Sequence, residues 1–282
     1  MAGLMVGSAR LRNEIFAGNR AVGRVAFTVA AGPGGSRRAR VHEAGSLRVR
    51  FPNGISQDML EAVIVNTAGG MAGGDRFGVE IGVGADARLT VTTAAAEKIY
   101  RSLGSDTQIG VKLDVGPGGV LAWLPQETIL FDQVRLRRSF DVDLAADSRL
   151  LLAEAIVFGR LAMGEAVMRG SLCDRWRVRV GGTLAFAETL RLDGDVAQCL
   201  AQRAVAAGGV AVATVLKRPG TEDDAAAVRA MQDSFAGEVG VSAWNGLVVA
   251  RLVAPEGATL HRDLVAVLTA LHNEPLPRLW AA

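Results

Sequence analysis

The sequence has 282 residues, which is enough to form a substantial hydrophobic core without disulfides or metal ions. Half of the residues are hydrophobic but only 5% are aromatic, and 34 are glycine, a composition that suits thin, closely packed layers. With 31 basic and 29 acidic residues, the formal net charge is only +2, so we expect neither nucleic acid nor a membrane surface as a partner.

Two features of the chain predict a cytoplasmic location. The cysteines, Cys173 and Cys199, belong to no CxxC or CxxH motif, which fits a reducing compartment where thiols stay free. Residues 1–12 lack the apolar stretch of a signal peptide, and no apolar run reaches the roughly 20 residues that span a bilayer.

Short runs in which apolar or β-branched residues alternate with polar ones predict strands over the first two thirds of the chain, for example at 24–30, 46–51 and 61–66. Four later units each contain a strand, a tight turn and a second strand, and predict β-hairpins. These units span residues 77–93, 108–124, 139–158 and 174–192.

The turns of these units, near residues 84, 116, 145 and 181, recur roughly every 30 residues, which is typical of stacked supersecondary units. A single hairpin must bury one face against its neighbours. The expected fold class is therefore mainly β, with serial hairpins forming a layered helicoid body that resembles a β-helix, and a few helices toward the C-terminus. An antiparallel sandwich produces the same alternation and stays open as an alternative.

After residue 193 the sequence becomes alanine-rich. Residues 195–207 and 221–235 have helical spacing, and Thr221 followed by three acidic residues is typical of a helix N-terminus. A strand pair at 239–242 and 246–253 and a helix at 261–272 follow. We expect one domain over residues 1–282, with a β body at about 14–193 and an α/β closing segment at about 194–282.

No catalytic motif stands out. The chain has no GxxxxGK[ST], HExxH or GxSxG pattern, and its three histidines, His42, His261 and His272, are scattered. The glycine-rich segment leads into Asp75 where a phosphate-binding loop needs a lysine, and it predicts a structural turn. That turn contains Gly69, Gly70, Gly73 and Gly74. We expect no enzymatic activity, no tightly bound cofactor and no firmly bound metal ion.

Four carboxylates lie in otherwise apolar segments: Glu127, Asp132, Glu154 and Glu165. Burying a carboxylate costs several kcal/mol unless it is paired or hydrated. Three interpretations remain open. The acids form ion pairs with arginines on neighbouring strands, they let a divalent cation pass weakly along a channel, or they form the carboxylate pair of an enzyme. The candidate ion-pair partners are Arg137, Arg138, Arg149 and Arg160.

Four segments occur in a characteristic order and spacing: NTAGGMAGGDRF at 66–77, TTAAAEKIYRS at 92–102, WLPQETILFD at 123–132 and RLLLAEAIVFGRLAMGE at 149–165. Together they resemble the urease accessory protein UreD family, also called UreH. The resemblance implies a non-enzymatic scaffold with a large, mainly β, helicoid fold that binds UreF, the GTPase UreG and the urease apoprotein. It also implies help in delivering nickel to the urease active site, by way of an internal passage proposed for the family.

The resemblance also implies site residues. By motif, roles in nickel transit or partner coupling fall on Asp75, Tyr100, Arg101, Glu127, Asp132, Glu154 and Glu165. Nickel would be a transient cargo. Some relatives have HPPGG where this chain has NTAGG, a departure that removes a histidine and argues against a metal role at that turn. The alternative function is a β-rich docking platform whose acids form structural ion pairs and play no part in metal transit.

Overall fold

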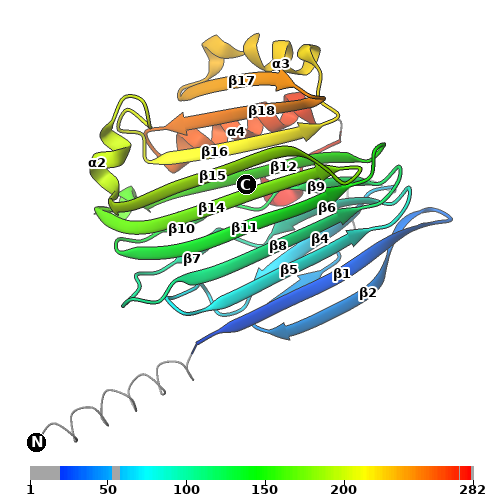
Figure 1. The fold of residues 1–282 in the computed structure, drawn as a ribbon, viewed down its shortest axis with the longest axis horizontal. Coiled ribbons are helices and arrows are strands. Elements are labelled where there is room, and N and C mark those ends of the chain that lie inside the picture. Colours follow the sequence, from blue (N-terminus) through cyan, green and yellow to red (C-terminus); the bar gives the residue numbers. More distant parts are fainter. Residues whose placement is uncertain (1–19, 53–57, 273, 281–282) are drawn as a thin grey trace, which may run out of the picture.

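The computed structural model describes residues 20–52, 58–272 and 274–280. The chain forms two β-sheets that lie face to face, with helices near one end (Figure 1). The seven-stranded sheet contains, in spatial order, β15 (Thr183–Asp195), β14 (Arg169–Val180), β11 (Val134–Leu144), β8 (Thr107–Val115), β5 (Arg76–Val83), β1 (Val22–Gly32) and β2 (Gly35–Gly45).

The second sheet has eleven strands. Its main path runs β17 (Glu238–Trp244), β18 (Leu247–Ala254), β16 (Ala211–Arg218), β12 (Arg149–Arg160), β9 (Val120–Trp123), β6 (Arg88–Thr93), β4 (Leu60–Asn66) and β3 (Leu47–Arg50). Three short strands pair beside this path, namely β7 (Glu97–Ile99), β10 (Thr128–Leu130) and β13 (Glu165–Ala166). The prediction of a mainly β, layered body with a few helices toward the C-terminus is confirmed.

Three of the four predicted hairpins are wrong in their pairing. The chain passes from β5 to β6, from β8 to β9 and from β11 to β12 by crossing between sheets, and each strand pairs in parallel with strands of earlier and later crossings. The turn sequences do not distinguish the two outcomes, because a strand, a tight turn and a second strand look alike in both. Crossing lets the strands of successive units hydrogen-bond in parallel, β5 with β8, β8 with β11 and β6 with β9, while the apolar faces of the two sheets pack against each other.

The recurring turns stack on one another. In each turn one backbone N–H donates, over 2.8–2.9 Å, to a carbonyl near the end of the neighbouring strand of the seven-stranded sheet. The donors are Gly84, Gly116, Ala145 and Gly181. These bonds continue the parallel ladder into the turns, and they explain why the turns recur at a regular spacing.

The fourth unit is a true hairpin. β14 and β15 pair antiparallel, and their turn contains Gly181 and Gly182 with φ of 56° and 82°. Positive φ at both central residues matches the twist of a two-residue hairpin and favours glycine there. This hairpin ends the parallel run of the seven-stranded sheet, as the β1–β2 hairpin does at the opposite edge.

The C-terminal third extends the eleven-stranded sheet with the antiparallel strands β16, β18 and β17. The helices are α2 (Val196–Ala201), α3 (Glu222–Arg229) and α4 (Gly257–Leu271), with 3₁₀ turns η1 (Leu161–Met163), η2 (Gln232–Ser234) and η3 (Arg278–Trp280). Thr221 caps α3 in a capping box with Asp224, as the sequence predicts, whereas α2 is much shorter than the expected 195–207. The division near residue 193 stays a prediction, and its first residues, 14–19, lie outside the described part.

Two apolar clusters hold the layers together. The larger lies between the sheets, and the smaller lies between the outer face of the eleven-stranded sheet and α3 and α4. Alternation along β12 serves both, since Leu150 and Leu152 face the first cluster while Leu151 and Ala153 face the second. None of the helices in the described residues has the length and apolar character needed to cross a membrane.

Candidate functional site

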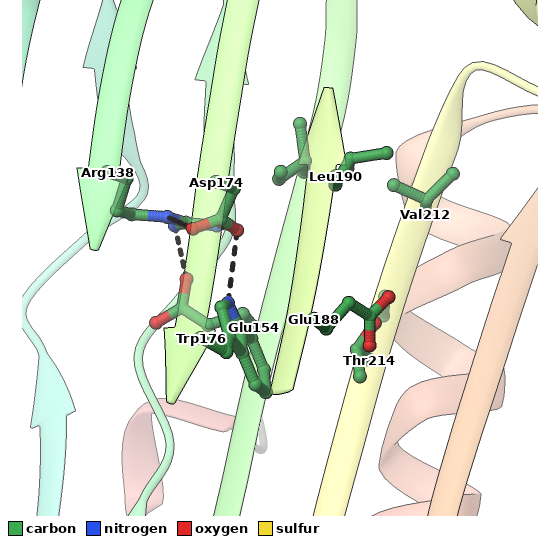
Figure 2. A pocket seen from close by; sticks show the side chains of 10 residues that line it. Arg138, Glu154, Asp174, Trp176, Glu188, Leu190, Val212 and Thr214 are labelled. Atoms are coloured by element: carbon green, nitrogen blue, oxygen red, sulfur yellow. Dashed lines mark hydrogen bonds and ion pairs between the residues drawn. The ribbon is translucent and has the colours of Figure 1, made fainter. Parts of the chain in front are cut away.

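Three charged side chains from three strands meet between the two sheets. Arg138 comes from β11, Glu154 from β12 and Asp174 from β14, and Figure 2 shows them converging. Arg138 Nη1 donates to Glu154 Oε2, while its Nε and Nη2 donate to Asp174 Oδ1 and Oδ2 over 3.1 and 2.7 Å. The side chains are only 3% (Arg138) and 6% (Glu154, Asp174) exposed, so this cluster, which we call the interior cluster, is shielded from water.

Strand alternation places these charges inside. Each of the three lies at an inward position whose neighbours two residues away on the same strand are buried apolar side chains. A charge at such a position costs free energy unless hydrogen bonds and an opposite charge compensate it. Together, the three strands supply one cation and two anions.

Other polar groups complete the interior cluster. The indole N–H of Trp123 donates to Glu154 Oε1 over 2.7 Å, and that of Trp176 donates to Asp174 Oδ2 over 3.2 Å. Arg138 Nη1 also contacts Thr128 Oγ1 at 3.2 Å. Each carboxylate therefore accepts hydrogen bonds from both a guanidinium and an indole, a fixed geometry typical of a buried polar network.

The charges do not balance when both acids are ionised. Burial raises the pKa of Glu154 to about 7, against the lowering effect of Arg138 and Trp123, and the nearby Asp174 raises it further. Burial lowers the pKa of Arg138, but its two carboxylate partners outweigh this and raise it, so the guanidinium stays charged. Near neutral pH the proton on Glu154 is therefore exchangeable.

Two cavities adjoin the interior cluster on different sides. A cavity of about 40 Å³ is lined by all three charged residues and extends toward Glu188 of β15 and Thr214 of β16 (Figure 2). A cavity of about 80 Å³ is lined by Arg138 and Glu154 and extends toward Glu97 of β7. Each has room for a few water molecules, which need roughly 10–15 Å³ apiece on this measure.

Glu97 is a half-buried acid that lines the larger cavity. Asn66 Nδ2 donates to both of its carboxylate oxygens, over 2.9 and 3.1 Å. Burial raises the pKa of Glu97, while the hydrogen bond from Asn66 lowers it.

Acidic side chains thus line the two cavities: Glu97 lines the larger, Glu154 lines both, and Asp174 and Glu188 line the smaller. Glu188 is partly exposed and accepts from Arg251 over 2.8 Å. We call this series of acids the acidic line.

Asp132 and Glu165 lie together elsewhere, beside the ends of β10 and β12. Glu165 pairs with Arg160 at 2.6 Å and accepts from the backbone N–H of Asp132 at 3.4 Å. Asp132 Oδ1 accepts from the N–H groups of Met168 and Arg169 over 2.8 and 3.0 Å. Burial raises the pKa of Asp132, but these backbone bonds lower it by more. Both acids hold the loop that joins β12 to β14.

Tyr100, Arg101 and Glu127 do not join the interior cluster. Tyr100 donates from its hydroxyl to the Gly69 carbonyl over 3.1 Å and packs edge-on against Phe131. Arg101 is exposed and pairs through its backbone with Val134, and Glu127 is half-buried.

Asp75 is buried in the glycine-rich turn. Its Oδ1 accepts from the N–H of Ala21 at 2.8 Å, and its Oδ2 accepts from that of Ala72 at 2.7 Å. Gly70 has a φ of 146°, and a Cβ there would lie 2.5 Å from the ring of Tyr100. The geometry of this turn is that of a structural element.

Among the residues that the structure describes, no group of three or more His, Cys, Asp or Glu side chains could hold a metal ion. The acids are divided between two cavities, since Glu97 lines only the larger and Asp174 and Glu188 line only the smaller.

A protein-family model for the UreD urease accessory protein matches residues 20–281. The chain belongs to the UreD family. Similar relatives include the "Urease accessory protein UreD" of Rhodopseudomonas palustris strain HaA2, 57% identical over 95% of this chain and 96% of the relative. The UreD proteins of R. palustris strain BisB5 and of Bradyrhizobium diazoefficiens are 54% and 53% identical, over 97% and 95% of this chain and 96% of each relative.

Membership in the UreD family confirms the resemblance carried by the four sequence segments. Of the acids singled out from the sequence of this UreD-family chain, only Glu154 lies in the interior cluster. Sequence reasoning missed the roles of Glu97, Asp174 and Glu188. For Asp174, the signal was available, since it interrupts an alternation of Leu172, Trp176 and Val178 that otherwise faces inward.

Proposed function

We propose that this chain is a non-enzymatic scaffold in urease maturation that binds the urease apoprotein, UreF and UreG and assists nickel delivery. The observation that carries the nickel part is the acidic line, whose side chains line two cavities that meet at Arg138 and Glu154. The free cysteines, Cys173 and Cys199, support a cytoplasmic setting for this work.

The chemistry of the line suits transit better than storage. Carboxylate oxygens bind divalent nickel less tightly than imidazole or thiolate ligands do. No His or Cys lines either cavity among the described residues. A cation entering the interior cluster would displace the exchangeable proton of Glu154 and compete with Arg138 for the two carboxylates.

A second function rests on a different observation in the same place. Arg138 already bridges Glu154 and Asp174, and Arg160 already pairs with Glu165, as the ion-pair interpretation predicts. In this alternative, the chain is a docking platform whose interior charges serve its fold, and nickel never enters it.

Co-expression tests the scaffold. The urease apoprotein, UreF and UreG are expressed with and without this chain, and co-purification and nickel-dependent urease activity are measured. We expect the chain to co-purify with the other proteins, and activation to be lost when it is omitted. Undiminished activation without the chain would overturn the proposal.

Glu97→Gln separates transit from docking. Glu97 has no cationic partner among the described residues, so its neutralisation breaks no ion pair, and the amide still accepts from Asn66. Transit predicts an intact complex with urease activation reduced several-fold, whereas docking predicts no change in either. The matched control is Glu80→Gln, an exposed acid on β5 paired with Arg24. If the two variants activate urease equally well, the path through Glu97 is excluded.

A further inference from the structure

A second polar region lies on the opposite face of the eleven-stranded sheet, where α4 ends. It is a pocket of about 270 Å³. Its floor is apolar and includes Val120, Leu151 and Leu271, while its charged side chains are mostly cationic. These charged or titratable residues are Arg88, Arg149, Lys217, Arg218, His272 and Glu274. We call it the basic pocket.

Strand register gathers the cations. Arg88 of β6 and Arg149 of β12 both lie opposite Val120 of the intervening β9, and Lys217 of β16 lies opposite Leu151. Arg88, Arg149 and Lys217 lie on the face covered by α4. Their neighbours in sequence, Leu89, Leu150 and Leu216, face the other sheet, and successive side chains of a strand point to opposite faces. The basic pocket and the interior cluster therefore share β12 but occupy its two sides.

Positive charge exceeds negative charge in this pocket. Arg88 pairs with Glu274, and Lys217 pairs with Asp224 at 2.7 Å. Arg218 donates only to the backbone carbonyls of Ser148 and Ala146, and neither it nor Arg149 has a carboxylate partner among the described residues. Two positive charges are thus left over beside an apolar floor.

Two buried polar atoms of the pocket also have no hydrogen-bond partner. They are Nε of Arg88 and Nε2 of His272. Most buried polar atoms in folded proteins are paired. Arg88 Nε is a donor, and His272 Nε2 is a donor when it carries the ring proton, so both atoms fit the acceptor oxygens of a ligand. A planar guanidinium and an imidazole are groups that recognise oxyanions, with the guanidinium fork giving direction to the contact.

We propose that the basic pocket binds a small oxyanion of the phosphate class, either inorganic phosphate or the phosphate group of an ester. Its oxygens accept from Arg88 and His272, and Arg149 and Arg218, which have no carboxylate partner among the described residues, supply the compensating charge. The volume suits a small molecule better than an extended polymer. This site is independent of the acidic line and of nickel.

Calorimetric titration of the purified chain tests the proposal. The probes are inorganic phosphate, glycerol phosphate as the ester, and chloride as a control for non-specific charge, at low ionic strength. We expect saturable binding of phosphate or the ester at millimolar concentration or below, and none for chloride. Tighter binding of the ester would identify the ligand as an ester, and comparable affinities would identify the phosphate group alone.

Variants locate the binding. Arg88→Gln should weaken it at least tenfold, whereas the matched control Arg24→Gln, an exposed arginine on the other sheet, should leave it unchanged. Arg149→Gln, at an exposed position, provides a second variant whose folding is not at risk, and it should weaken binding several-fold. Equal binding by wild type and both pocket variants would place phosphate elsewhere and overturn the proposal, as would the absence of saturable binding.

Discussion

The two faces of the central part of the eleven-stranded sheet present opposite charge. On the inner face, Glu154 joins Arg138 and Asp174 in a cluster with two acids and one base, all nearly inaccessible to water. On the outer face, the basic pocket has more cations than anions, and Arg88 is 37% exposed. One strand, β12, contributes to both regions, because its side chains alternate between the two faces. The two regions differ in burial. The buried inner charges affect the stability of the fold, whereas the more exposed outer charges are accessible to a ligand.

The largest effect that this comparison predicts follows from Arg138→Met. The change leaves two buried carboxylates without their cation, and breaking a buried ion pair in this way costs about 3–5 kcal/mol of unfolding free energy. Urea denaturation measures the loss. Arg137→Met is the matched control on the same strand, since Arg137 is 70% exposed and pairs with Asp106 on the surface, where a pair contributes about 1 kcal/mol at most. Equal losses in both variants would contradict the distinction between buried and exposed charge.

The sequence predicts the strands well and their partners poorly. Alternation in β5, β8 and β11 identifies which side chains are buried, but not whether the next strand lies beside them or in the other sheet. That choice depends on contacts between successive units of the body. One example is the hydrogen bond from the Gly116 N–H to the Val83 carbonyl, which joins residues 33 positions apart in the chain.

The candidate site shows the same limit. Glu154 is conspicuous in the sequence because apolar residues surround it, but its hydrogen-bond partners, Arg138 and Trp123, are 16 and 31 positions away in the chain. Local patterns show that Glu154 needs a partner, and only the packing of three strands across two sheets selects which ones. The basic pocket has no local signature in the sequence, because Arg88, Lys217 and His272 come from three separate regions and none is unusual by itself.

The next effect concerns pH, and it belongs to the inner face. The pKa of Glu154 is raised to about 7 in the folded chain, so the stabilising contribution of its protonated form is fully present below the unfolded pKa and is lost as pH rises through about 7. A rise of this size corresponds to about 3 kcal/mol of unfolding free energy between acid and mildly alkaline solution. In Glu154→Gln, the unfolding free energy should therefore decrease less between pH 5 and pH 8 than in the wild type.

Urea denaturation at pH 5, 6, 7 and 8 measures the effect. The control Glu80→Gln removes an exposed acid from the outer face of the other sheet and should keep the wild-type slope, because Glu154 remains in place. A Glu154→Gln profile as steep as that of the wild type would show that another group causes the pH dependence.

The smallest effect lies in the basic pocket and has the opposite sign. Burial lowers the pKa of His272, and Lys217 and Arg88 lower it further, while Glu274 raises it. A base with a lowered pKa contributes stability that is present above its unfolded pKa of about 6.5 and is lost as pH falls through the folded value. His272→Gln should therefore reduce the loss of unfolding free energy in acid. The change should be smaller than that caused by Glu154→Gln, because His272 is less buried.

Added phosphate tests whether His272 lies next to the bound oxyanion. An oxyanion beside the imidazole favours its protonated form, so phosphate should diminish the loss of stability in acid in the wild type and not in His272→Gln. Thermal unfolding at pH 5.5 and 7.5 with and without phosphate measures both changes. A phosphate effect of the same size in the variant would show that His272 does not contact the oxyanion. The curves without phosphate would still show whether the Glu154 and His272 variants change the pH dependence of stability in opposite directions.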